Sequence, residues 1–279
     1  MSLRFKNINA SNFKKIKTVF LDIDGTLSNS QRIIPQRVID SVKRINTKCE
    51  VILVTGRPFK GALDAYNLLN LHSKAIVTLN GGAIFDSEFE TIYLDEMTLK
   101  ENCSLLDLQK FIPCTLNFFT AREWYCTNTN DPIVIKEEDI VKFPAISIQS
   151  LNFVKNTPFS KYLIFAQKED LIKAYPIMEK MFPDRIRIHV YHDYFEIFSK
   201  TSSKGAGVAF VQDKFNFKKD ECLAIGDTEN DLYMFQEVGI GVLMDNGDRA
   251  LEKYANCLTS SSDECGVAEV LDYLYEQLK

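Results

Sequence analysis

The chain contains 279 residues, enough for about two domains at roughly 100–200 residues each. Hydrophobic residues make up 46% of it and charged residues 25%, which is ordinary for a globular protein and excludes a disordered chain. The formal net charge of −5 argues against a nucleic-acid partner or a polybasic membrane anchor. No apolar run approaches the roughly 20 residues that span a bilayer, so we expect no membrane partner.

The cysteines and the N-terminal segment bear on the cellular compartment. The seven cysteines are odd in number and form no Cys-x-x-Cys pair, whereas a disulfide scaffold or a zinc site needs paired spacing. We therefore expect reduced thiols, mostly buried as small hydrophobic residues, in a cytoplasmic protein. Residues 1–17 contain basic residues but no apolar core, which is unlike a secretory signal.

The first 85 residues predict alternating strands and helices. Three short apolar runs each stop at a turn containing glycine, as strands buried on both faces do. These strands are expected at 18–21, 51–54 and 75–77. A helix is expected after Pro35 and a second one from Leu63 to Leu71, because apolar residues there recur at helical spacing. The order predicts an α/β fold with a doubly wound parallel sheet, which is Rossmann-like, and right-handed crossovers.

The pattern changes between residues 86 and 194. Longer strands of alternating hydrophobicity are typical of an antiparallel sheet with one solvated face. Strands are expected at 115–120, 124–127, 145–149, 162–165 and 185–191, with two helices at 99–111 and 171–181. We interpret 86–194 as an α+β cap domain inserted into the first domain. Trp124 and Tyr125 are expected in its core, with stacking on a sugar ring as the alternative.

From residue 195 to residue 279 the first pattern returns. Ser203 is placed to cap a helix. Strands are expected at 222–225 and 239–243, and helices at 231–235, 248–254 and 267–278. The predicted core domain therefore comprises residues 1–85 and 195–279.

Acidic side chains follow two of the predicted parallel strands. Asp22 and Asp24 come directly after the first strand, and Asp227 follows the strand at 222–225. In an open parallel sheet, ligands bind beyond the carboxyl ends of the strands. Clustered carboxylates repel one another and need a cation, and an all-oxygen ligand set suits Mg²⁺.

Cationic and hydrogen-bonding groups are expected at the same edge of the sheet. Thr55 ends the second strand, and Lys204 lies at the start of the helix that follows Ser203. Together with backbone N–H groups near Gly25 and Gly56, these side chains could hold an anion. An acidic metal site beside an anion site is what phosphoryl transfer requires.

Four motifs in chain order resemble those of the haloacid dehalogenase superfamily. They are residues 22–26 (DIDGT), 51–58 (VILVTGRP), 203–205 (SKG) and 226–231 (GDTEND). Residues 80–84 and the tail around Gly266 are similar to the Cof-type branch, which inserts a large α/β cap between its second and third motifs. The resemblance covers nearly the whole chain and implies a catalytic core with an inserted cap.

The resemblance also implies roles for individual residues. Asp22 would be the nucleophile and a Mg²⁺ ligand, and Asp24 would be the acid–base residue and a ligand through its backbone carbonyl. Asp227 would be the third metal ligand, supported by Asp231. The phosphoryl group would be bound by Ile23, Thr55, Gly56, Lys204 and Asn230.

Two further residues are expected near the substrate, each with an alternative. Arg57 faces the substrate or braces the cap, and Asn80 lines the substrate or is only a turn residue. Two loops, 244–247 and 261–266, depart from the pattern of the family. We expect these departures to affect substrate detail rather than chemistry.

The implied function is that of a Mg²⁺-dependent phosphomonoester hydrolase that acts through an aspartyl-phosphate intermediate. Its substrate would be a small phosphorylated metabolite, with a sugar phosphate as the first candidate and nucleotides, pyridoxal phosphate or flavin phosphate as alternatives. A phosphomutase of the same fold and a catalytically silent phosphometabolite-binding protein are the alternative functions. The short spacing from Asp227 to Asn230 favours the phosphatase. A monomer or a small homo-oligomer is expected.

Overall fold

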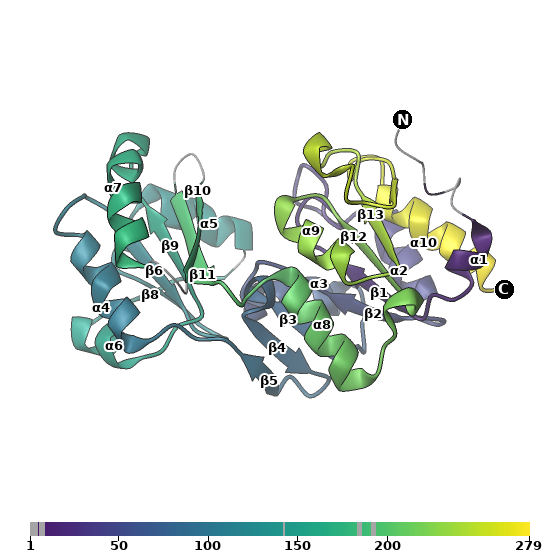
Figure 1. Ribbon diagram of the computed structural model, residues 1–279, viewed down its shortest axis with the longest axis horizontal. Coiled ribbons are helices and arrows are strands. Elements are labelled where there is room, and N and C mark those ends of the chain that lie inside the picture. Colours follow the sequence, from purple (N-terminus) through teal and green to yellow (C-terminus); the bar gives the residue numbers. More distant parts are fainter. Residues whose placement is uncertain (1–4, 6–8, 142, 183–185, 191–193) are drawn as a thin grey trace. The chain divides into compact units, whose positions relative to one another are not determined.

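The computed structural model describes residues 5, 9–141, 143–182, 186–190 and 194–279, which form two compact units (Figure 1). The first unit contains Met1–Gly56, Ala62–Ile92 and Ser203–Lys279. The second contains Arg57–Gly61 and Tyr93–Ser202.

A five-stranded parallel sheet forms the centre of the first unit. Its strand order is β14-β13-β12-β1-β2. The strands are β1 (Thr18–Leu21), β2 (Glu50–Leu53), β12 (Cys222–Gly226), β13 (Ile240–Leu243) and β14 (Cys257–Leu258). Every residue of β1, β12 and β13 is buried, as the uninterrupted apolar runs predict. The predicted α/β class with a parallel sheet is confirmed.

A second, three-stranded sheet continues from the edge of the first. It consists of β3 (Ala75–Thr78), β4 (Ala83–Asp86) and β5 (Thr91–Leu94), in that order. A parallel bridge between Val54 and Val77 connects β3 to the residue after β2. The short 3₁₀ turn η2 (Leu79–Gly81) joins β3 to β4. The turn therefore lies beside the end of β2, where the second motif begins its loop.

Helices connect these strands. They are α1 (Ala10–Phe13), α2 (Gln36–Ile45), α3 (Phe59–Leu68), α8 (Lys204–Phe215), α9 (Glu229–Gln236) and α10 (Gly266–Gln277). α2 follows Pro35 as predicted and buries the apolar face that includes Val38 and Val42. The helix predicted at 248–254 is wrong: only the 3₁₀ turn η4 (Arg249–Leu251) forms there. Leu251 alone is buried in this turn, which leaves too little apolar surface to hold a longer helix.

The second unit is built on a six-stranded sheet of order β10-β11-β9-β6-β7-β8. The strands are β6 (Thr115–Phe119), β7 (Trp124–Cys126), β8 (Ile146–Ser147), β9 (Lys161–Phe165), β10 (Ile186–Val190) and β11 (Tyr194–Ser199). Neighbouring strands are antiparallel except β7 and β8, which are parallel. The helices of this unit are α4 (Leu99–Leu108), α5 (Pro132–Val141), α6 (Leu151–Asn156) and α7 (Lys168–Met181).

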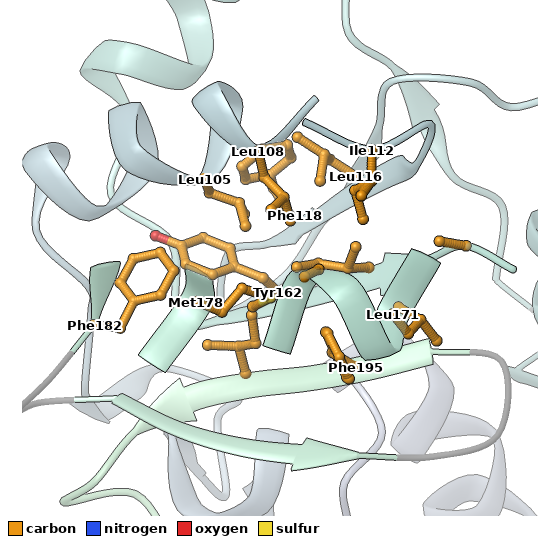
Figure 2. Packing of buried hydrophobic residues seen from close by; sticks show 14 of the residues in the cluster. Leu105, Leu108, Ile112, Leu116, Phe118, Tyr162, Leu171, Met178, Phe182 and Phe195 are labelled. Atoms are coloured by element: carbon orange, nitrogen blue, oxygen red, sulfur yellow. The ribbon is translucent and has the colours of Figure 1, made fainter. Parts of the chain in front are cut away.

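The hydrophobic core of the second unit joins helices α4 and α7 to this sheet (Figure 2). Leu105 and Met178 come from the two helices, and Phe118, Tyr162 and Phe195 come from three strands. The Tyr162 hydroxyl donates a hydrogen bond to the side-chain oxygen of the buried Asn102. This bond pairs two buried polar groups within the core.

Two features of the second unit differ from the predictions, and one prediction is confirmed. The predicted solvated face is absent from β6 and β9, because every residue of these strands is buried. α5 and α6 were not predicted; α5 begins at Pro132, and its apolar residues Ile133–Ile135 resemble a strand. Trp124 is fully buried, and its indole N–H donates to Asn117 at 2.9 Å, which confirms the prediction that it belongs to the core.

The units divide at residues 92 and 202 rather than at 85 and 194. β4 and β5 belong to the first unit because they continue the sheet of β3. β11 belongs to the second unit because it pairs with β9 along its length.

None of the helices in the described part of the chain combines the length and apolar character needed to cross a lipid bilayer. All seven cysteines lie among the described residues and are free thiols, four of them buried.

Candidate active site

Three carboxylates converge at the carboxyl ends of the neighbouring strands β1 and β12. Asp22 follows β1, Asp227 follows β12, and Asp231 lies in the first turn of α9. One carboxylate oxygen of each lies within 4.8 Å of the other two. Asp22 and Asp231 are buried, and Asp227 is half-buried. The parallel pairing of β1 and β12 brings together residues that are about 200 positions apart in the chain.

Lys204 provides the positive charge at this cluster. It is the first residue of α8, where the hydroxyl of Ser203 caps the helix by accepting from Ala206 N at 3.0 Å. The Lys204 ammonium lies 2.7 Å from Asp22 Oδ1 and 2.7 Å from Asp231 Oδ1. All three side chains are buried. The lysine thus holds the Asp22 carboxylate at a fixed position.

The electrostatics of the cluster favour a further cation. Burial raises the pKa of Asp22 well above its usual range; Lys204 opposes this, and the nearby carboxylates reinforce it. Burial and the charge of Asp231 raise the pKa of Asp227 to about 6. Burial alone would lower the pKa of Lys204, but its two carboxylate partners outweigh burial and raise it. One ammonium therefore faces three carboxylates, and a hard divalent cation with oxygen ligands fits this donor set.

Both carboxylate oxygens of Asp231 already accept hydrogen bonds from donors of the protein. Its Oδ1 accepts from Lys204, and its Oδ2 accepts from the backbone N–H of Asp227 and the backbone N–H and hydroxyl of Thr228, at 2.9–3.1 Å. It closes the turn between β12 and α9 and places Asp227. This leaves Asp22 and Asp227 as the side chains of the cluster with oxygens available for a cation.

Asp227 is oriented by residues that sequence analysis did not single out. The Thr26 hydroxyl donates to its Oδ1 at 2.9 Å. Asn246 donates its amide to the Gly25 carbonyl at 2.8 Å and lies 3.5 Å from Asp227 Oδ2. Gly25 has φ +75°, and a Cβ there would lie 2.2 Å from Asp227 Oδ2, so only glycine fits.

The loop 244–247 carries Asn246 into contact with the acidic cluster. Whether the departures of this loop from the family pattern affect only substrate detail stays a prediction. Thr228 had a usable signal, because Thr and Asp three residues apart at a helix start form a capping box. Thr26 and Asn246 carry no comparable spacing signal.

Asp24, Ile23 and Asn230 are the other predicted residues of the first and fourth motifs. Asp24 is exposed, and its charge raises the pKa of Asp22 and Asp227, which places it close to them. Ile23 is buried, and its carbonyl accepts from both the N–H and the hydroxyl of Ser28. Asn230 is half-buried in the first turn of α9.

Four predicted residues belong to the loops after β2 and β3. Thr55 is buried, and its carbonyl accepts from Asn80 N at 3.0 Å. The Asn80 side chain packs against Gly56. Arg57 belongs to the second unit, where its guanidinium donates to the Gly61 carbonyl at 3.3 Å. Its predicted role at the substrate therefore stays a prediction.

The sequence is similar to those of several known proteins. It is 27% identical over 258 residues to a Haemophilus influenzae protein provisionally named as a phosphatase, covering 92% of this chain and 97% of that protein. It is 26% identical over 263 residues to the phosphoglycolate phosphatase of Archaeoglobus fulgidus, covering 93% and 97%. A solved haloacid dehalogenase-like hydrolase from Bacteroides thetaiotaomicron is 26% identical, covers 92% of this chain and 98% of its own, and superposes with a TM-score of 0.86.

The chain also matches a known protein family over most of its length. Residues 19–271 match the family described as haloacid dehalogenase-like hydrolase, a span that includes all four motifs and the second unit. The resemblance to the haloacid dehalogenase superfamily and its Cof-type branch is confirmed. The chain is therefore an enzyme of the haloacid dehalogenase-like hydrolase family.

Proposed function

We propose that the protein is a Mg²⁺-dependent phosphatase that hydrolyses a small phosphorylated metabolite through an aspartyl phosphate on Asp22. The observation that carries the proposal is the buried Asp22 carboxylate, fixed by Lys204 at 2.7 Å beside Asp227. A carboxylate nucleophile divides the hydrolysis into two easier displacements. Relatives that are named as phosphatases, and that match this chain over nearly their whole length, support this class of reaction.

The chemistry uses the two aspartates of the first motif. An oxygen of Asp22 attacks phosphorus, while the ester oxygen leaves with its electron pair and takes a proton from Asp24. A water molecule then attacks phosphorus, Asp24 accepts its proton, and inorganic phosphate leaves as the Asp22 carboxylate is regenerated. Donating its proton in the first step leaves Asp24 ionised, so it is ready to accept the proton of the attacking water in the second step.

The metal would be held by Asp22 and Asp227 through their side chains and by Asp24 through its backbone carbonyl. When bound, Mg²⁺ would neutralise charge on the phosphoryl oxygens and on the nucleophile. Ile23, Thr55, Gly56 and Asn230 are the proposed partners of the phosphoryl oxygens, together with the Lys204 ammonium. Asp231 would take no part in coordination, since four protein donors already occupy its oxygens.

A sugar phosphate is the first candidate substrate. One solved structure of the same fold, 22% identical with a TM-score of 0.76, is described as the sugar phosphatase BT4131. The phosphoglycolate phosphatase among the relatives also points to a small organic phosphate. Nucleotides and the phosphates of pyridoxal and flavin are the alternative substrates.

Chelation of divalent cations is expected to reduce phosphate release to background, and added Mg²⁺ is expected to restore it. The reason is that clustered carboxylates need a cation before an anionic phosphate can approach. Ca²⁺ is expected to inhibit, because its larger and looser coordination shell displaces the nucleophile. The measurement is phosphate release from a panel of phosphorylated metabolites. Full activity in excess chelator would contradict the proposal, and an isomeric product in place of phosphate would indicate a mutase.

Lys204→Met is expected to lower kcat/KM by about 10²–10³, the scale of one electrostatic donor in an active site. The variant keeps the length of the side chain but removes the charge that lies between Asp22 and Asp231. Without it, the attacking carboxylate and the phosphate repel each other in a partly dry site. The measurement is steady-state hydrolysis of p-nitrophenyl phosphate at saturating Mg²⁺.

Lys161→Met is the matched control for Lys204→Met. Lys161 forms a buried ion pair with Glu196 in the second unit, and both residues lie outside the four motifs. Both variants lose a buried cation and are expected to unfold at lower temperature. Only Lys204→Met is expected to lose hydrolysis, with Lys161→Met within about threefold of the wild type. Equal losses of hydrolysis would show that the effect comes from stability alone.

A further inference from the structure

The side chain of Asn80 is a buried polar group whose oxygen has no protein partner. Asn80 is 2% exposed, and no described residue donates a hydrogen bond to its enclosed Oδ1. Buried polar atoms in native proteins are nearly always paired, because an unpaired one loses its hydration without compensation. An enclosed and unpaired amide oxygen beside an active site therefore indicates a ligand that completes it.

The backbone around Asn80 is held in an unfavourable conformation. Leu79, Asn80 and Gly81 have φ values of +50°, +53° and +88°, all in the left-handed region. This region suits glycine and tolerates asparagine, but it is costly for leucine. Such strain persists only where the surroundings fix it, and it is concentrated at functional sites. The turn is therefore built to hold the Asn80 amide in one place.

The turn is fixed from two sides by motif residues. On one side, Asn80 N donates to the Thr55 carbonyl at 3.0 Å, and the position of a Cβ on Gly56 lies only 3.0 Å from Asn80 Oδ1. On the other side, a Cβ on Gly81 would lie 2.1 Å from the carbonyl oxygen of Ser203, the residue before Lys204. The turn thus lies between the proposed phosphate-binding loop, which the Asn80 amide contacts, and the start of the helix whose first lysine holds Asp22.

We infer that the amide of Asn80 binds a hydroxyl group of the substrate next to the phosphorylated carbon, so that the enzyme selects hydroxylated phosphate esters. This inference rests on the proposed function. The unpaired atom is the amide oxygen, which needs a hydrogen-bond donor. A hydroxyl group of the substrate supplies one, whereas a carboxylate can only accept. A substrate without the hydroxyl leaves the amide unpaired, which is the strongest way for a site to reject it.

The test compares 2-hydroxyethyl phosphate with ethyl phosphate. The two esters differ by one hydroxyl group, which is carried by the carbon next to the phosphorylated carbon. The wild type is expected to prefer the hydroxylated ester by about 10-fold or more in kcat/KM. In Asn80→Gly, which removes the amide and tolerates the left-handed backbone, the ratio is expected to fall close to one. The loss is expected to be larger on the hydroxylated ester than on ethyl phosphate.

Asn70→Gly is the control. Asn70 also has a left-handed backbone, with φ +52°, but it is exposed and lies between α3 and β3. This variant is expected to keep the wild-type ratio.

Three results would overturn the inference: a wild-type ratio near one, an unchanged ratio in Asn80→Gly, or an equal loss on both esters in that variant. The first needs no variant, so the test does not depend on how Asn80→Gly folds. Hydrolysis of p-nitrophenyl phosphate by the wild type distinguishes a failure of this inference from a failure of the proposed function. If it occurs and the ratio is near one, only the inference fails; if no ester is hydrolysed with Mg²⁺, the proposed function fails.

Discussion

Asp22→Asn is expected to abolish phosphate release, with a loss of about 10⁴-fold or more, the scale seen when a catalytic nucleophile is removed. An amide is a poor nucleophile, and the substitution also removes one charge from the proposed metal site. The side chain keeps its size, and burial next to Asp227 and Asp231 already disfavours the charged form of Asp22. The variant is therefore expected to fold. The measurement is steady-state hydrolysis of p-nitrophenyl phosphate, with the thermal unfolding temperature as a check on folding.

Asp40→Asn is the matched control for this variant. Asp40 is exposed on α2, where it accepts a hydrogen bond from Gln36, and it lies outside all four motifs. Its substitution is expected to leave hydrolysis within about twofold of the wild type, as for most surface changes. An Asp22→Asn enzyme that retains substantial activity would mean that another group attacks phosphorus.

Asp24→Asn is expected to lower the rate by about 10²–10⁴, the usual contribution of a general acid–base residue. The proposed metal contact of Asp24 is its backbone carbonyl, which the substitution preserves, so Mg²⁺ binding is expected to persist. Esters with good leaving groups need less protonation and are expected to lose less in the first step. The measurement compares kcat/KM for p-nitrophenyl phosphate and for an alkyl phosphate. Wild-type activity, or equal losses on both esters in the first step, would contradict the assigned role.

The parallel sheet of the first unit was predictable because its strands are buried on both faces. Apolar runs such as 222–225, stopped by glycine, have few other stable structures. Asp22 and Asp227 could be placed together for the same reason, since parallel strands end at one edge of a sheet. Lys204 was expected at the same edge because it begins a helix, whereas its ion pairs with Asp22 and Asp231 were not predicted.

The second unit was less predictable because its strands do not follow the rule of one solvated face. Lys161 and Asn117 are polar but buried in the sheet, where an ion pair and an indole hydrogen bond satisfy them. Sequence patterns cannot distinguish such residues from exposed ones, because the partners lie on other strands. The same reason explains why Thr26 and Asn246 were missed. Thr26 contacts Asp227 from 201 residues away in the chain, and Asn246 contacts it from 19 residues away.

The most direct test of the account is the location of phosphate on the enzyme during turnover. The wild type and Asp24→Asn are mixed with Mg²⁺ and p-nitrophenyl phosphate, quenched in acid within milliseconds, digested and analysed by mass spectrometry. We predict an acid-stable phosphate on the peptide that contains Asp22, with more of it in Asp24→Asn, where water activation is impaired, and none in Asp22→Asn. Phosphate on a different residue, or phosphate retained by Asp22→Asn, would contradict the central claim that Asp22 is the nucleophile.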